Sequence, residues 1–209
     1  MTHSLHRVGT VESLKGDWIL LCMPSKDINH EGSAPKLKRF LQIVRANNCV
    51  TFGDCRGGNE YYQGSKEAVV ENVEDRAVVT AAFNNEKDII SALKQLKEED
   101  LGLSVVVSGL VEGAAKCAHE AGLKIHTVNQ SLGRWGNTSK LPPEDILPIH
   151  AMCGHAMVSV NLINEMIEKV RKGSITAEEA SKELFKPCMC GIFNTDRCTK
   201  LIKAIVASS

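Results

Sequence analysis

Three cysteines and a histidine lie in two short groups in the C-terminal third of the chain. The first group is Cys153-Gly154-His155 and the second is Cys188-Met189-Cys190-Gly191. Thiolate and imidazole groups gathered in this way are typical ligands of metal ions and iron-sulfur clusters. We therefore predict a cluster, of the [4Fe-4S] type, held by the three thiolates. His155, Cys55, Cys22 or an exogenous ligand would complete the fourth iron.

The same residues leave other chemistry open. Cys153, His155, Cys188 and Cys190 are also a ligand set for tetrahedral zinc, although the paired C-x₂-C spacing usual for structural zinc is absent. In a metal-free protein, Cys153 would be a nucleophile with His155 as its base or acid. Both groups are expected just before or at the start of a helix, where the helix dipole lowers thiol pKa values. An iron without a protein ligand would bind substrate, whereas a fully ligated cluster would transfer electrons.

The chain has eight cysteines, and the other five are either expected core residues or candidate ligands. Cys49, Cys117 and Cys198 fall on apolar stretches and are expected in the core. Cys22 and Cys55 each follow or end a predicted strand. Cys55 is the better candidate, because it lies in a Gly-rich loop where functional residues are common.

Composition excludes several classes of protein. The 209 residues include 25 basic and 25 acidic side chains, so no electrostatic footprint for nucleic acid is visible. The N-terminal residues lack the apolar run of a signal peptide, and no later stretch is long enough to span a membrane. We therefore expect a cytoplasmic protein, in which eight cysteines favour metal binding or catalysis over disulfides. The expected partner is a small-molecule ligand or a redox protein.

Strands and helices alternate along the first part of the chain. Residues 7–14 and 18–23 read as a hairpin, further strands are expected at 49–52, 77–82, 103–107 and 124–128, and helices at 33–44, 88–97 and 111–121. Such alternation predicts an α/β fold with a doubly wound, mostly parallel sheet. Residues 1–130 would form this sheet domain. Residues 131–209 would be a helical segment packed on the same domain and carrying both cysteine groups, with a capping box at Thr176 and Glu179 and a helix cap at Asn194.

Polar side chains follow several of the predicted strands. In a parallel sheet the loops after the strands face one crevice, which would collect the predicted binding residues Lys26, Asp54, Arg56 and Arg134. Lys26 and Arg134 suit a carboxylate or phosphate, and Trp135 would wall the pocket. The alternative is that these side chains are polar only because loops face solvent.

Three runs in the C-terminal third also carry a resemblance. Residues 132–136, Cys153-Gly154-His155 and residues 188–194 together resemble an uncharacterised family of anaerobic prokaryotes. The resemblance implies no activity, but it implies an anaerobic setting in which an oxygen-sensitive cluster survives. The leading hypothesis is an iron-sulfur or other metal-binding protein that is a redox protein or acts on a small anionic substrate. A metal-free cysteine enzyme and a zinc-stabilised binding module remain the alternatives.

Overall fold

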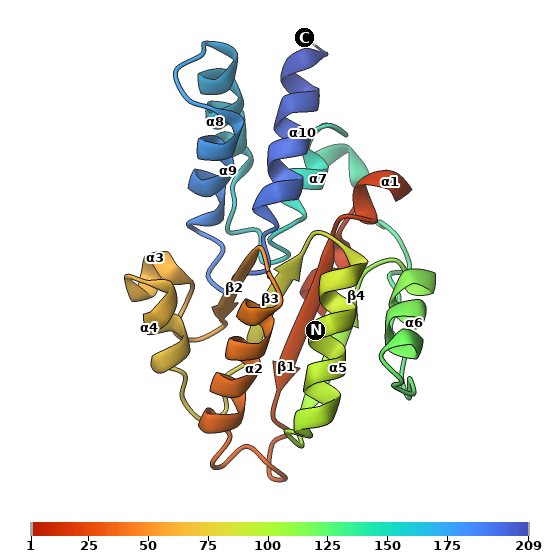
Figure 1. Cartoon of the computed structure of the whole chain (residues 1–209). Coiled ribbons are helices and arrows are strands. Elements are labelled where there is room, and N and C mark those ends of the chain that lie inside the picture. Colours follow the sequence, from red (N-terminus) through yellow and green to blue (C-terminus); the bar gives the residue numbers. More distant parts are fainter. Residues whose placement is uncertain (1, 209) are drawn as a thin grey trace.

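A four-stranded antiparallel sheet lies at the centre of the computed structural model, which describes residues 2–208 (Figure 1). The strands, in the spatial order β2-β3-β1-β4, are β1 (Trp18–Met23), β2 (Thr51–Asp54), β3 (Val79–Phe83) and β4 (Ser104–Ser108). Helix α2 (Ala34–Ala46) joins β1 to β2, and helix α5 (Glu86–Glu99) joins β3 to β4. This is the β-α-β-β-α-β topology called ferredoxin-like, a name that implies no bound cluster.

The prediction of a doubly wound, mostly parallel sheet is wrong. Strands form near four of the expected positions, but β3 runs antiparallel to both β1 and β2. A parallel neighbour needs a long crossover, usually a helix, that carries the chain back across the sheet. The connection from β2 to β3 contains the short helices α3 (Glu60–Gln63) and α4 (Lys66–Glu71) and does not recross the sheet, because Val79 at the start of β3 pairs with Asp54 at the end of β2. Periodicity identified the strands but could not give their direction.

Two other expected strands are missing from the described part of the chain. Residues 7–14 contain helix α1 (Val11–Leu14), which Thr10 caps by accepting a hydrogen bond from the amide of Ser13. Residues 124–128 are irregular, so no fifth strand extends the sheet within residues 2–208. Met1 and Ser209, the outer limits of the two predicted units, lie outside the described residues.

The first face of the sheet is covered by an apolar core under α2 and α5. Leu37, Phe40, Leu41 and Val44 recur at helical spacing along α2 and are all fully buried. Ser33 precedes α2 but makes no side-chain capping bond. Instead, the carboxylate of Asp75, from the loop before β3, accepts hydrogen bonds from the amides of Gly32 and Ala34. A residue distant in sequence thus fixes the start of α2.

The second face carries a separate core built from the C-terminal third. Its helices are α7 (Leu147–His150), α8 (Val160–Arg171), α9 (Ala177–Phe185) and α10 (Thr195–Ala207). Figure 1 shows α2 and α5 in front of the sheet and α8, α9 and α10 as a group above it. Ile19 and Ala82 from the sheet pack into this second core. The remaining elements are α6 (Val111–Glu120) and the 3₁₀ helices η1 (Thr2–His6) and η2 (Thr138–Lys140), and none of the helices in residues 2–208 is long and apolar enough to cross a membrane.

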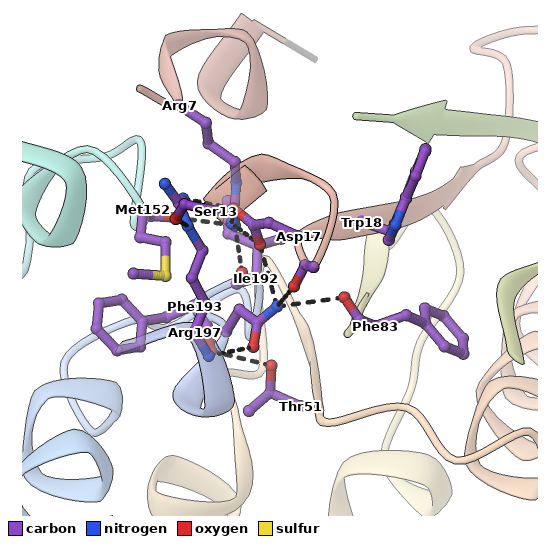
Figure 2. Close-up of polar contacts among 12 residues, drawn as sticks. Arg7, Ser13, Asp17, Trp18, Thr51, Phe83, Met152, Ile192, Phe193 and Arg197 are labelled. Atoms are coloured by element: carbon purple, nitrogen blue, oxygen red, sulfur yellow. Dashed lines mark hydrogen bonds and ion pairs between the residues drawn. The ribbon is translucent and has the colours of Figure 1, made fainter. Parts of the chain in front are cut away.

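A buried ionic network joins the two ends of the chain to the sheet (Figure 2). Asp17, directly before β1, forms ion pairs with Arg7 and with Arg197 in the first turn of α10, and all three side chains are at most 7% exposed. Burial lowers the pKa of the Arg197 guanidinium, and the Asp17 carboxylate opposes that shift. Asn194 caps α10 through its side-chain oxygen and donates to Asp17 Oδ1 over 3.1 Å. Each charge in this network therefore depends on its neighbours for compensation.

Removing the central carboxylate should destabilise the fold strongly. Asp17→Asn leaves two buried guanidinium groups without a counter-charge, which costs about 3–5 kcal/mol of unfolding free energy. Urea-induced unfolding measures the change. Glu12→Gln is the control, because it removes a carboxylate from the exposed Lys15 pair and should leave the unfolding midpoint nearly unchanged. Equal effects of the two substitutions would contradict a structural role for the network.

Candidate functional site

Residues 188–194, which we call the covering segment, lie against the second face of the sheet without joining it as a strand. Polar side chains from the rest of the chain hold its backbone carbonyl groups in place. The side chain of Asn59 donates to the carbonyl of Cys188 (2.9 Å), and that of Thr80 donates to the carbonyl of Cys190. The side chain of Arg7 donates to the carbonyl of Ile192, and that of Thr51 donates to the carbonyl of Phe193 (3.0 Å). Buried carbonyl groups need such partners, so these bonds replace a strand ladder.

Two glycines allow the covering segment to touch the strand backbone. A Cβ atom at Gly53 in β2 would lie 2.8 Å from the carbonyl carbon of Cys190. A Cβ atom at Gly191 would lie 2.2 Å from the carbonyl carbon of Phe52, and Gly191 also has φ +81°, a conformation that favours glycine. This contact places Cys190 beside β2, and Cys55 follows Gly53 by two residues.

Four cysteines meet at this point, and we call Cys55, Cys153, Cys188 and Cys190 the thiol cluster. The thiol of Cys188 interacts with those of Cys153 and Cys190, and the thiol of Cys55 interacts with that of Cys190. Cys153, Cys188 and Cys190 are at most 1% exposed, and Cys55 is half-buried. His155 Nδ1 lies 3.6 Å from the sulfur of Cys190. The five residues predicted as metal ligands therefore lie together, while ligation itself stays a prediction.

The loop after α7 surrounds the sulfur of Cys153 with hydrogen-bond donors. Gly154 and Ala156 have φ angles of +69° and +55°, and the amides of His155 and Met157 point to the sulfur. Left-handed backbone at a non-glycine residue is strained, and such strain concentrates at functional sites. The thiol of Cys188 is the largest cause that lowers the pKa of Cys153, to about 6, and the two amides add to it.

The same contacts act in the opposite direction on the partner thiols. Hydrogen bonds with the thiols of Cys153 and then Cys190 raise the pKa of Cys188 well above its usual value, and burial raises it further. The pKa of Cys55 is raised first by its hydrogen bond to Cys190 and then by burial. The thiolate form of Cys153 is thus favoured by the hydrogen bond with Cys188, and the same bond raises the pKa of Cys188.

The second cysteine group precedes a helix start, as predicted, because α10 begins at Thr195 with Asn194 as its cap. The first group lies further from one, since α8 begins at Val160, well after Cys153. The lowered pKa of Cys153 comes from a thiol and from loop amides, not from a helix dipole. The ring of His155, the expected base for Cys153, places its Nδ1 atom 3.6 Å from the sulfur of Cys190.

The four residues predicted to bind a substrate do not share one crevice. Lys26 lines a pocket of about 320 Å³ with Asp27, His30 and Arg76. Arg134 pairs with Glu144 at 3.1 Å and lines a different pocket of about 850 Å³. Asp54 is buried and accepts a hydrogen bond from the amide of Arg56, whose side chain donates to the Asp75 carbonyl. The antiparallel sheet separates loops that a parallel sheet would have gathered.

Several residues that build the site carried no clear signal in the sequence. Thr51 and Thr80 are ordinary strand residues by type, and their role depends on facing the covering segment across the sheet. Asp17 resembles a turn residue after Gly16. Asn59 is an ordinary polar loop residue by type, but it caps α3 and donates to the carbonyl groups of Phe185, Lys186 and Cys188. Its position before a helix was the one detectable signal.

Comparison with known proteins does not identify a family or a function for this site. No family model matches the chain, and neither the curated proteins nor the solved structures contain a significant match. Among the side chains of residues 2–208, no three from His, Cys, Asp and Glu are arranged as a binding site for one metal ion. The arrangement in the thiol cluster is a chain of neighbouring sulfurs, and function must be argued from that.

Gly53→Ala should disturb the cluster through backbone contact alone. The added methyl group would overlap the carbonyl of Cys190, and such overpacking costs about 1–3 kcal/mol. The variant should unfold at lower urea concentration, and mass spectrometry should find Cys190 alkylated faster. Gly16→Ala is the matched control, because its nearest atoms lie at ordinary distances of 3.5 and 3.9 Å. Unchanged protection of Cys190 in Gly53→Ala would contradict the proposed contact.

The thiolate of Cys153 should be detectable in reduced, metal-free protein. Its pKa of about 6 lies below the ordinary 9.0, so thiolate absorbance in the far ultraviolet should rise as pH increases through 6. The unfolded chain binds the extra proton between pH 6 and 9, so this group should increase stability across that window. Cys153→Ser should abolish the early rise in absorbance, whereas Cys22→Ser should not, because burial raises the Cys22 pKa to about 12. An early rise that persists in Cys153→Ser would assign the thiolate elsewhere.

Proposed function

We propose that the chain is an iron-sulfur protein whose cluster is ligated by Cys55, Cys153, Cys188 and Cys190. The observation that carries this proposal is the meeting of four thiols from three separate segments inside the second core. Thiol hydrogen bonds are weak, so they give little reason to gather four cysteines in one place. Iron-sulfur clusters are typically held by four cysteine thiolates, and amide donors to sulfur, as found at Cys153, tune their potential.

A single zinc ion held by the same cysteines is the other metal site to consider. Tetrahedral zinc requires all four donors at about 2.0–2.3 Å from one point. Within residues 2–208 the four sulfurs follow one another as neighbours, and no three His, Cys, Asp or Glu side chains are arranged around one metal position. In a [4Fe-4S] cluster each thiolate binds a different iron, so the sulfurs now in contact would move apart to admit the cluster. Metal analysis distinguishes the two sites.

The fourth cysteine changes the chemistry expected of the cluster. With Cys55 among the ligands, all four irons have a protein sulfur and none is left open for a substrate. Electron transfer then follows, in place of action on a small anionic substrate. His155 would act on the cluster through Cys190 rather than as an iron ligand.

The cluster would lie close to the molecular surface on the His155 side. Residues 155–157 are exposed although the sulfurs of Cys153 and Cys190 beneath them are buried. A redox partner that contacts this loop would therefore lie close to the cluster. The eight free cysteines suit a reducing, cytoplasmic and anaerobic setting, in which such a cluster survives.

A metal-free thiol enzyme is the second candidate, supported by the lowered pKa of Cys153. A nucleophile must also reach its substrate, and Cys153 is completely buried. His155, the expected base, faces Cys190. This candidate would need the loop at 154–157 to open before any reaction.

Metal analysis tests the proposal directly. Protein purified without oxygen, or reconstituted with iron and sulfide, should contain about four iron and four sulfide atoms per chain. Cys188→Ser and Cys190→Ser should each lose most of the iron and the visible absorbance, because each removes a central ligand. Cys49→Ala is the matched control, since Cys49 packs against the first core and should leave the iron content unchanged.

Three results would contradict the proposal. A colourless, iron-free protein after reconstitution would exclude the cluster. Stoichiometric zinc bound by the same cysteines would favour the structural alternative. Rapid alkylation of Cys153 in a protein that binds neither metal would favour the thiol enzyme.

A further inference from the structure

Exposed apolar side chains gather in one short part of the chain. Of the twelve large apolar residues that the described surface exposes, six fall within residues 123–141. Leu132 and Trp135 are 86% and 82% exposed, the highest values within residues 123–141. The other four are Leu123, Ile125, Val128 and Leu141. Apolar groups concentrated in this way mark an interaction surface.

The backbone of this region also forms few hydrogen bonds. Between residues 124 and 135 of the described chain, no amide donates to a backbone carbonyl, and Gly133 donates only to the side chain of Ser131. Local side-chain bonds nevertheless hold its shape, because Trp135 Nε1 donates to the Leu132 carbonyl over 2.9 Å and Arg134 pairs with Glu144. The region is thus an irregular segment with several backbone groups that form no hydrogen bond to another backbone group.

Strand β4 lies at one edge of the sheet and has an edge that could pair with such a segment. It pairs with β1 on one side, and no strand within residues 2–208 pairs with its other side. All five residues of β4 are half-buried, although Val105 and Val107 pack against the first core. An open edge of this kind is a template for strand addition.

We propose that two copies of the chain form a dimer in which residues 124–128 of each copy add to the β4 edge of the other. The added segment is as long as β4, so every β4 residue gains a partner. The charges allow this contact, because residues 122–143 carry Lys124 and Lys140 but no acidic side chain, and α6 beside β4 exposes Glu112. Glu120 on α6 pairs with Lys116, and Arg134 pairs with Glu144.

The available area and symmetry also fit a second copy. Two copies of Trp135 would bury roughly 300–500 Å², a substantial part of the roughly 1,200–2,000 Å² in a stable interface. Reciprocal exchange gives a closed two-fold arrangement, the commonest symmetry of homo-oligomers. It also covers the β4 edges of both copies. Residues 124–128, predicted as a strand, would then pair with a strand of the other copy and not with a strand of their own sheet.

Light scattering over a dilution series, combined with hydrogen exchange, tests this dimer on the full chain. The wild type should be dimeric, with slowed exchange at 104–108 and 124–128 that is lost on dilution. Ile125→Pro removes an amide donor, and Trp135→Ala removes a side chain that is 82% exposed in the monomer. Each should weaken dimerisation by at least about tenfold. Val11→Pro is the control, because it alters another exposed apolar residue at a helix position that tolerates proline.

The remaining outcomes would overturn the proposal. They are a monomer at every concentration, slowed exchange at 124–128 in the monomer, and a dimer unaffected by Trp135→Ala. Binding of a monomer to anionic lipid vesicles through Trp135 would assign the surface to a membrane instead. Circular dichroism of each variant checks folding, and iron content can be measured separately, so failure of the dimer leaves the cluster proposal intact.

Discussion

A buried carboxylate between two guanidinium groups determines how the C-terminal third attaches to the sheet. Asp17 precedes β1, Arg7 comes from the N-terminal segment, and Arg197 belongs to α10. None of these charges is stable in the interior without the others, so the three segments can take only positions that keep them together. Arg7 extends the constraint by donating to the carbonyl group of Ile192, which belongs to the covering segment. The network therefore fixes a piece of backbone, and the thiol cluster depends on that backbone.

The two faces of the sheet show why burial alone does not identify a site. Cys22 and Cys117 lie in the first core, and burial is the leading cause that raises their pKa values. In the second core, the leading cause at Cys55, Cys153 and Cys188 is another thiol. A cysteine whose pKa is shifted mainly by burial is replaceable by a residue of similar size. Cysteines whose pKa values are shifted mainly by one another are in mutual contact and form a unit. The contrast separates structural cysteines from candidate ligands more clearly than their exposure does.

Local patterns in the sequence predicted the elements well and their arrangement poorly. The capping box at Thr176 and Glu179 and the cap at Asn194 are confirmed, because both depend on residues a few positions apart. The parallel sheet was wrong, because strand direction depends on what the connection between β2 and β3 does in space. The grouping of Cys153, Cys188 and Cys190 could be anticipated from residue type. The contact of Gly53 with Cys190 could not, since it joins segments with no sequence pattern in common.

Hydrogen bonds among thiols also suggest how folding and cofactor binding are related. A thiol is a weak donor and a weak acceptor, so the chain of contacts from Cys55 to Cys153 stabilises the second core little. The strong polar bonds lie around the cluster, at Asn59, Thr80 and Arg7, and they hold backbone rather than sulfur. The scaffold can therefore form before any metal arrives, while the sulfurs exchange weak bonds for metal bonds. Binding then adds to the stability of a folded site and does not have to create the fold.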